Sequence, residues 1–134
     1  MPTNSEIVQS LYASFDTGDI AGATAVMADD IVWNEAENNH LADGNPYVGP
    51  QAVVEGVFVQ LGSDFEGFRV EREAFVTEGD TVVMQGRYHF TATATGSAAS
   101  PQVVHWWTVK EGRITGFQQH IDTLELARAL GQLA

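Results

Sequence analysis

The chain has 134 residues, the size of one typical domain, and 44% of them are hydrophobic, which is enough to bury a core. It contains no cysteine, which excludes disulfides and thiol nucleophiles and fits a reducing, cytoplasmic location. Its 18 acidic and 6 basic residues give a formal net charge of -12, which disfavours nucleic acid and membrane surfaces as partners.

Three helices are predicted in the first half of the chain. The first begins at a capping-box pattern in residues 3–6, and the second is capped by Asp19 and runs to about Ala28. A short apolar strand is expected over residues 31–34. Gly49-Pro50 begins the third helix, because proline is favoured at the first helical position. Residues 36–49 form the longest irregular stretch, and loops of this length are typically lids or mobile connectors.

The second half reads as strands followed by one helix. The β-rich segments are residues 68–76, 81–95, 102–109 and 113–122, and the final helix is expected over residues 123–133. Helices first and an antiparallel meander afterwards indicate an α+β domain with helices packed on one face of a sheet.

The segment from Val103 to Val109 is apolar on both faces of the predicted strand. One face should meet the helices. We expect a second subunit to cover the other face, because a monomer rarely exposes such a patch. Trp106 points to that outer face and is the predicted anchor of a homodimer.

Five short motifs together resemble one superfamily. They are Thr17-Gly18-Asp19, Ala28-Asp29-Asp30-Ile31-Val32-Trp33, Val48-Gly49-Pro50-Gln51-Ala52-Val53, Lys110-Glu111-Gly112-Arg113-Ile114 and Gln119-His120-Ile121-Asp122-Thr123. In this order and spacing the chain resembles the nuclear-transport-factor-2-like (NTF2-like) superfamily, and within it the ketosteroid-isomerase-like and SnoaL-like proteins. The resemblance covers nearly the whole chain. It implies one SnoaL-like domain over residues 1–134, shaped as an NTF2-like cone with helices on one face of a curved, mainly antiparallel sheet.

The resemblance also implies roles for single residues. Glu35 matches the general-base aspartate of the ketosteroid isomerases, and His105 matches the carboxylic acid that donates a hydrogen bond to the oxyanion. The tyrosine that completes that oxyanion hole should lie near Leu11, and Tyr12 is expected to point elsewhere on its helix. Asp122 matches the base of the SnoaL-like cyclases. Proteins of this kind need no metal or organic cofactor.

The residues themselves leave two readings open at each position. Glu35 follows an apolar strand, so it is either a buried general base with a raised pKa or a solvated loop carboxylate. His105 is either a hydrogen-bonded core residue or a donor to a substrate carbonyl. His120 and Asp122 share a predicted strand face and could form an acid–base pair, but Asp122 also fits the cap of the last helix.

Four aromatic residues fall on elements that should surround a cavity: Trp33, Tyr47, Phe58 and Trp107. They are predicted to bind an apolar ligand, with ordinary core packing as the alternative for each. The four histidines lack the spacing of a metal site, so no metal is expected.

These patterns predict a protein with a binding pocket for a small apolar, cyclic or polyketide-like molecule. If it is an enzyme, proton abstraction next to a carbonyl is expected, hence isomerisation, aldol-type cyclisation or dehydration. Glu35 or Asp122 would be the base, and His105 would polarise the substrate oxygen with help from His120. The alternatives are a non-catalytic binder with the same pocket and a dimerisation domain whose own aromatic side chains fill the cavity.

Overall fold

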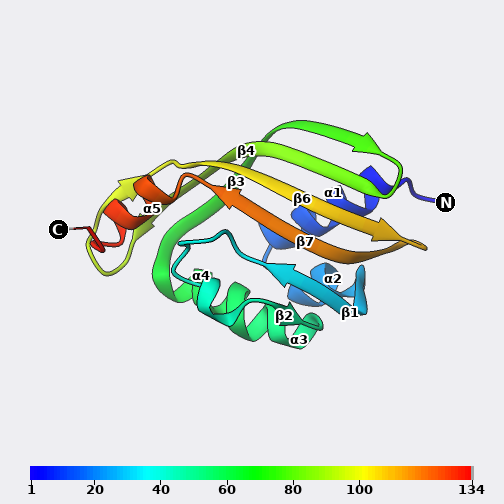
Figure 1. The fold of residues 1–134 in the computed structure, drawn as a ribbon, viewed down its shortest axis with the longest axis horizontal. Helices are drawn as coiled ribbons and strands as arrows, with labels where there is room; N and C mark the ends of the chain where they lie inside the picture. The colour runs from blue at the N-terminus through cyan, green and yellow to red at the C-terminus, as the bar shows by residue number, and fades with distance from the viewer. Residues whose placement is uncertain (134) are drawn as a thin grey trace.

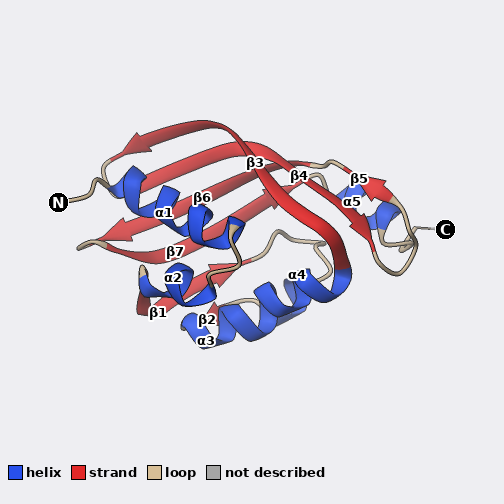
Figure 2. Ribbon diagram, turned by 180° about the vertical axis from the view of Figure 1, so that it is seen from behind, coloured by secondary structure: helices blue, strands red, loops and turns tan. Residues whose placement is uncertain are grey.

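The computed structural model describes residues 1–133, which form a bent, seven-stranded mixed sheet with helices packed on one face (Figures 1 and 2). The strands are β1 (Met27–Asn34), β2 (Tyr47–Val48), β3 (Phe65–Glu78), β4 (Thr81–Ala92), β5 (Ala98–Ala99), β6 (Gln102–Lys110) and β7 (Arg113–Ile121). Their order is β2-β1-β7-β6-β4-β3, and β5 pairs with β4 off this path. The expected fold class, helices on one face of a curved, mainly antiparallel sheet, is confirmed.

The helical elements precede the long strands, except for one at the end of the chain. They are α1 (Asn4–Asp16), α2 (Ile20–Ala25), η1 (Ala42–Gly44), α3 (Pro50–Val53), η2 (Val54–Phe58), α4 (Val59–Asp64) and α5 (Thr123–Ala129). In Figure 2, α1 to α4 lie in front of the sheet, whose opposite face is left uncovered in Figure 1. No helix within residues 1–133 has the length and apolar character needed to cross a bilayer.

The predicted capping box of α1 is present. The Thr3 side chain accepts a hydrogen bond from the backbone N–H of Glu6, whose carboxylate accepts one from the backbone N–H of Thr3. The cap satisfies backbone N–H groups at the start of α1, whose buried residues face the sheet: Ile7, Val8, Leu11 and Tyr12.

The second helix ends earlier than predicted. It was expected to reach about Ala28, but α2 ends at Ala25 and β1 already begins at Met27. The reason is tertiary pairing, because Met27 is fully buried and pairs with Ile114 of β7. β1 runs parallel to β7, whereas the other strand pairs are antiparallel.

The third helix begins at Pro50 as predicted, but it contains a π turn. Residues 54–58 (η2) interrupt the α-helical hydrogen bonding between α3 and α4. Val57 and its neighbour Phe58, both in this turn, line the cavity described below.

The segment of residues 36–49 contains short regular elements and side-chain hydrogen bonds, although the sequence predicts an irregular loop. It includes η1 and β2, and the Asn45 side chain accepts from the backbone N–H of Glu35 and donates to the backbone carbonyl of Glu35. The Tyr47 hydroxyl donates to the carbonyl of Leu41 at 2.7 Å. The expected mobility of this segment stays a prediction, and these bonds are what an opening would have to break.

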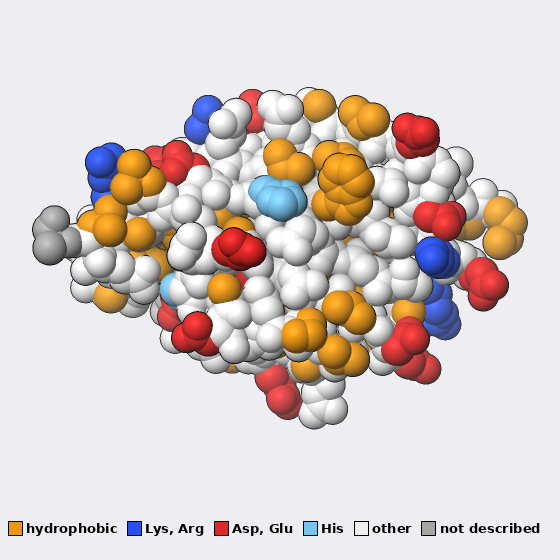
Figure 3. Space-filling view, viewed as in Figure 1, with side chains coloured by type: hydrophobic (Ala, Val, Ile, Leu, Met, Phe, Trp, Pro, Cys, Tyr) orange, Lys and Arg blue, Asp and Glu red, His pale blue; other side chains and the backbone are white. Residues whose placement is uncertain are grey.

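Burial alternates along β6 as predicted. Val103, His105, Trp107 and Val109 are buried beneath the helices, while Trp106 on the outer face is 49% exposed. Figure 3 shows this outer face, with hydrophobic side chains in several groups among polar ones. β3 shifts its register against β4 in two places, between Glu66 and Arg69 and between Arg72 and Ala74.

Candidate active site

A cavity lies between the helices and the inner face of the sheet. Its free volume is about 40 Å³, below the roughly 300–1,000 Å³ of typical small-molecule pockets, so a larger ligand requires the side chains of the wall to move. Most of its wall is aliphatic or aromatic, contributed by α1, β1, the helical segment 50–64 and the inner faces of β3, β4, β6 and β7. The polar side chains in the wall are those of Tyr12, Glu35, Tyr88, His105 and Gln119.

Glu35 follows the last residue of β1 and lies inside the protein, with 3% of its surface exposed. Its Oε2 accepts a hydrogen bond from Nε1 of Trp33 at 3.1 Å. No lysine, arginine or histidine within residues 1–133 forms a salt bridge with it. Burial therefore dominates and raises the pKa of Glu35 from 4.5 to about 7, although the Trp33 hydrogen bond acts in the opposite direction. This is the buried carboxyl of the two sequence readings, not the solvated one.

His105 also lies in the cavity wall, but both of its ring nitrogens are engaged. Nδ1 lies 2.6 Å from the Tyr12 hydroxyl and Nε2 lies 2.5 Å from the Tyr88 hydroxyl. Burial lowers the pKa of His105 from 6.5 to about 3, so the ring is neutral at neutral pH. A direct hydrogen bond from His105 to a ligand, as expected from the sequence, would require one of these two bonds to break.

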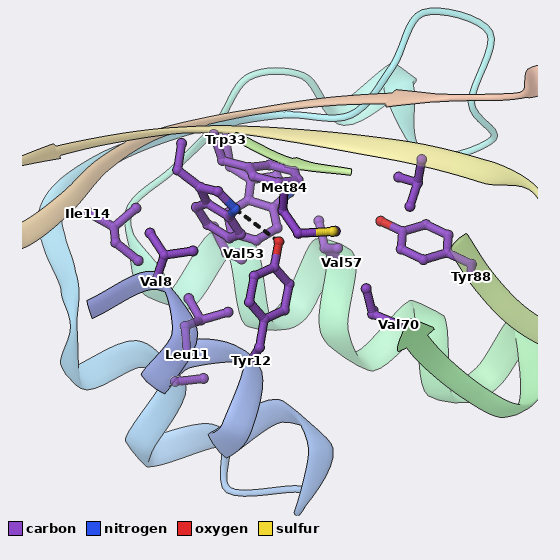
Figure 4. Close-up of a cluster of buried hydrophobic side chains, with 14 of the residues drawn as sticks. Val8, Leu11, Tyr12, Trp33, Val53, Val57, Val70, Met84, Tyr88 and Ile114 are labelled. Carbon is purple, nitrogen blue, oxygen red and sulfur yellow. Dashed lines mark hydrogen bonds between the residues drawn. The ribbon is translucent and has the colours of Figure 1, made fainter. Parts of the chain in front are cut away.

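The expectation for Tyr12 was wrong. Its ring reaches the cavity, 3% exposed, and its hydroxyl accepts a hydrogen bond from Nε1 of Trp107 at 3.0 Å. In Figure 4 the Tyr12 and Tyr88 rings enter the core from different elements, each with its hydroxyl turned inward. The position matched to the family's tyrosine falls on Leu11, and Leu11 and Tyr12 both line the cavity.

Sequence reasoning missed Tyr88 and Gln119. Tyr88 shares the phase of the buried residues Met84 and Phe90 in β4, so alternation alone could have placed it on the inner face. Gln119 follows Phe117 by two positions on β7 and is buried with it.

The predicted pair of His120 and Asp122 is not in the cavity. Gln119 and Phe117 face inward on β7, so His120 has the opposite phase and is exposed on the outer face. It borders a surface groove that Glu35 also borders. Asp122 is the N-cap of α5 and accepts a hydrogen bond from the backbone N–H of Glu125 at 3.1 Å. The helix cap is thus the observed role of Asp122, and the face assignment from the sequence was one residue out of phase.

Of the four predicted ligand-binding aromatics, Trp33, Phe58 and Trp107 line the cavity. Tyr47 does not. Its ring packs against Gly44 and Gly56, where a Cβ at either glycine would overlap it. Its hydroxyl is used by the Leu41 carbonyl, so Tyr47 holds the segment before α3 and is absent from the cavity wall. Within residues 1–133 no three histidine or carboxylate side chains gather as metal ligands would.

Comparisons with known proteins agree on one family. The family model of a SnoaL-like domain matches residues 8–117. An NTF2-like protein of Burkholderia thailandensis E264 is 35% identical, with a TM-score of 0.92 over 97% of this chain and 98% of that one. TerC, co-crystallized with polyporic acid, is 25% identical, with a TM-score of 0.85 over 96% of this chain and 98% of its own.

A protein of Jannaschia sp. CCS1, provisionally described as a SnoaL-like polyketide cyclase, shares the fold. It is 18% identical, with a TM-score of 0.83 over 98% of this chain and 93% of that one. A comparison with curated proteins gives no match.

Proposed function

Because this chain belongs to the SnoaL-like family, we propose that its cavity binds a small, mostly apolar cyclic or polyketide-like molecule and that Glu35 moves a proton next to its carbonyl. The apolar wall supports the ligand class, since burial of hydrocarbon surface would supply most of the affinity. The co-crystallization of TerC with polyporic acid supports a small-molecule ligand for a protein of this fold.

The proposal rests on one observation, the burial of the Glu35 carboxyl in the cavity wall. A carboxyl with a pKa of about 7 is divided between its charged and neutral forms at neutral pH, so it can accept a proton and return it. The carboxylate would remove a proton from the carbon next to the carbonyl, and the electron pair would move to the carbonyl oxygen as an enolate. The neutral acid would then give the proton back at another atom of the ligand.

Glu35 is the only carboxylic acid among the described residues that line the cavity. One group must therefore both take and return the proton. This requirement fits isomerisation and dehydration, and it fits an aldol-type cyclisation in which the enolate attacks a second carbonyl of the same molecule. Asp122, the other predicted base, would have to leave its helix cap to take part.

The experiment is a thermal-shift screen followed by a turnover assay. The screen covers polyketides, terpenoids, cyclic ketones and polyporic acid, and compounds that raise the melting temperature are tested for conversion. Glu35→Gln should still bind a converted compound while losing roughly 10²–10⁴-fold in turnover, the weight of positioned acid–base catalysis. The matched control is Glu37→Gln, an exposed carboxyl two residues away, which should keep full turnover.

The outcomes separate the alternatives. Binding without turnover in the wild type indicates a non-catalytic binder, and full turnover in Glu35→Gln contradicts the assigned base. No thermal shift with any compound favours the third alternative, a dimerisation domain whose aromatic side chains fill the space. The aromatic contacts across the cavity, such as Trp33 to Phe58 with ring centroids 5.7 Å apart, are what that alternative requires.

We also propose that the protein is a homodimer through the outer face of the sheet. The support is the half-exposed Trp106 in the middle of that face, beside Val83 on β4 and Gln118 on β7. A partner would cover the hydrophobic groups visible in Figure 3.

A further inference from the structure

Five buried side chains form one continuous line of hydrogen bonds across the cavity wall: Trp107, Tyr12, His105, Tyr88 and Gln119. The successive distances are 3.0 Å from the indole Nε1 to the Tyr12 hydroxyl, 2.6 Å from there to Nδ1 of His105, 2.5 Å from Nε2 to the Tyr88 hydroxyl, and 2.9 Å to Nε2 of Gln119. All five are buried, and all five line the cavity.

At both ends of this line, donor and acceptor of the hydrogen bond are fixed. The indole nitrogen of Trp107 can only donate, so the Tyr12 oxygen accepts from it. The amide of Gln119 is fixed by its oxygen, which accepts from the backbone N–H of Ala36 at 3.2 Å and from Nδ2 of Asn39 at 2.8 Å. The Asn39 oxygen in turn accepts from the backbone N–H of Leu41. Nε2 of Gln119 therefore donates to the Tyr88 oxygen.

The neutral imidazole of His105 carries one N–H and one acceptor nitrogen. One tyrosine hydroxyl must donate to the acceptor nitrogen, and the other must accept from the ring N–H. The tyrosine that accepts from His105 also accepts from its outer neighbour, so its own O–H hydrogen has no partner within this line. The arrangement leaves one phenolic O–H available to the cavity.

We propose that Tyr88 is the tyrosine with the available O–H, and that it donates this hydrogen to the ligand oxygen on which negative charge develops. His105 is then a positioning residue, whose Nε2–H occupies the Tyr88 oxygen and prevents Tyr88 from donating into the line. Tyr12 donates to Nδ1 and is fully used. This proposal rests on the proposed function and replaces direct donation by His105 with donation by Tyr88.

Two observations favour Tyr88 over Tyr12. Tyr88 and Glu35 line the cavity together and also line a smaller hollow that adjoins it toward residues 39–41, whereas Tyr12 lines only the first. The charge of Glu35 contributes to raising the pKa of Tyr88, so these two cavity groups interact electrostatically. Burial is the largest cause of the raised pKa of Tyr88, so its hydroxyl keeps its hydrogen at neutral pH.

The consequence is a requirement on the ligand. It must present an oxygen acceptor to Tyr88 while the adjacent carbon faces Glu35, and the rest of the molecule must be apolar. A preorganised donor of this kind strengthens as the carbonyl oxygen becomes an enolate, which is where such a bond contributes to catalysis.

The tautomer of His105 tests the proposal without any ligand. Two-bond ¹H–¹⁵N spectra of the ¹⁵N-labelled wild type should show a protonated Nε2 and an unprotonated Nδ1 at neutral pH, because that tautomer frees Tyr88. A proton on Nδ1 would free Tyr12 instead and would overturn the assignment. A doubly protonated ring would free both hydroxyls and would overturn it as well.

A matched pair of probes tests the donor itself. 1-Indanone and indane differ by the carbonyl acceptor, so the ratio of their dissociation constants reports the hydrogen bond. Tyr88→Phe should reduce the preference for 1-indanone by roughly fivefold, the net weight of one neutral hydrogen bond. Tyr47→Phe removes a hydroxyl outside the cavity and should leave the preference intact.

The assignment would be overturned if Tyr12→Phe lost the preference for 1-indanone over indane while Tyr88→Phe kept it. If Tyr88→Phe does not fold, or neither probe binds, the wild-type tautomer decides alone. The proposed function fails separately, because it is contradicted by full turnover in Glu35→Gln, whatever the tautomer of His105.

Discussion

Replacing Glu35 by glutamine should change how the stability of the protein depends on pH. In the unfolded chain the carboxyl of Glu35 loses its proton near pH 4.5, whereas in the folded protein it does so near pH 7. Between these values unfolding releases a proton, so the contribution of Glu35 to the free energy of unfolding falls as the pH rises. Above pH 7 both states are ionised and the loss is complete.

The size of the effect follows from the two pKa values. At about 1.4 kcal/mol for each pH unit between 4.5 and 7, the ionised form of Glu35 costs the fold about 3 kcal/mol at pH 8. Glutamine has the same shape and never ionises, so Glu35→Gln should avoid this cost. Its amide hydrogens need partners in a cavity that offers few, but that penalty is independent of pH.

Urea unfolding followed by tryptophan fluorescence at pH 4 and pH 8 measures the effect. The stability of Glu35→Gln relative to the wild type should increase by about 3 kcal/mol between the two pH values. His105, whose pKa of about 3 makes stability rise with pH up to 6.5, contributes equally to both proteins and cancels. Glu37→Gln should run parallel to the wild type. Parallel curves for Glu35→Gln would refute the reasoning, because they would mean that Glu35 ionises in the fold as easily as in water.

Three further results are expected. Asp122→Asn should leave the melting temperature unchanged because asparagine also caps helices, whereas Asp122→Ala should cost about 1 kcal/mol by chemical unfolding; equal losses in both would contradict the capping role. Gly86→Ala should cost about 1–3 kcal/mol because its Cβ would overlap the backbone carbonyl oxygen of Glu71, while Gly62→Ala, in open space on α4, should be neutral or stabilising by the same measurement. Trp106→Glu should convert a dimer to a monomer in light scattering, since it would bury a charge at the proposed interface, and a monomeric wild type at micromolar concentration would remove that proposal.

The fold was predictable because its determinants are local and periodic. The capping box at Thr3, the proline at position 50 and the alternation in β6 each act within a few residues, and the structure contains all three. The boundary between α2 and β1 was not, because Met27 becomes part of a strand only through its pairing with Ile114, 87 positions away on β7.

The candidate site was predictable only in part, for a similar reason. Glu35 and His105 could be placed from the strands that carry them, but their partners come from elsewhere in the chain. Tyr12 is 93 positions from His105, and Gln119 is 80 positions from Asn39, so no local pattern connects them. His120 was predicted on the inner face of β7 together with Asp122. The buried Phe117 indicates the opposite, because residues an odd number of positions apart on a strand point to opposite faces.

The π turn at residues 54–58 has a consequence for how the cavity of this protein can change. A helix with such a turn contains one residue more than an α-helix between the same end points. Loss of a single residue there would restore continuous α-helical bonding with Pro50 and Phe65 still in place, and it would change which side chains of this segment face the cavity. Deletion of one codon could thus reshape the space for a ligand while leaving the sheet and the Glu35 carboxyl where they are.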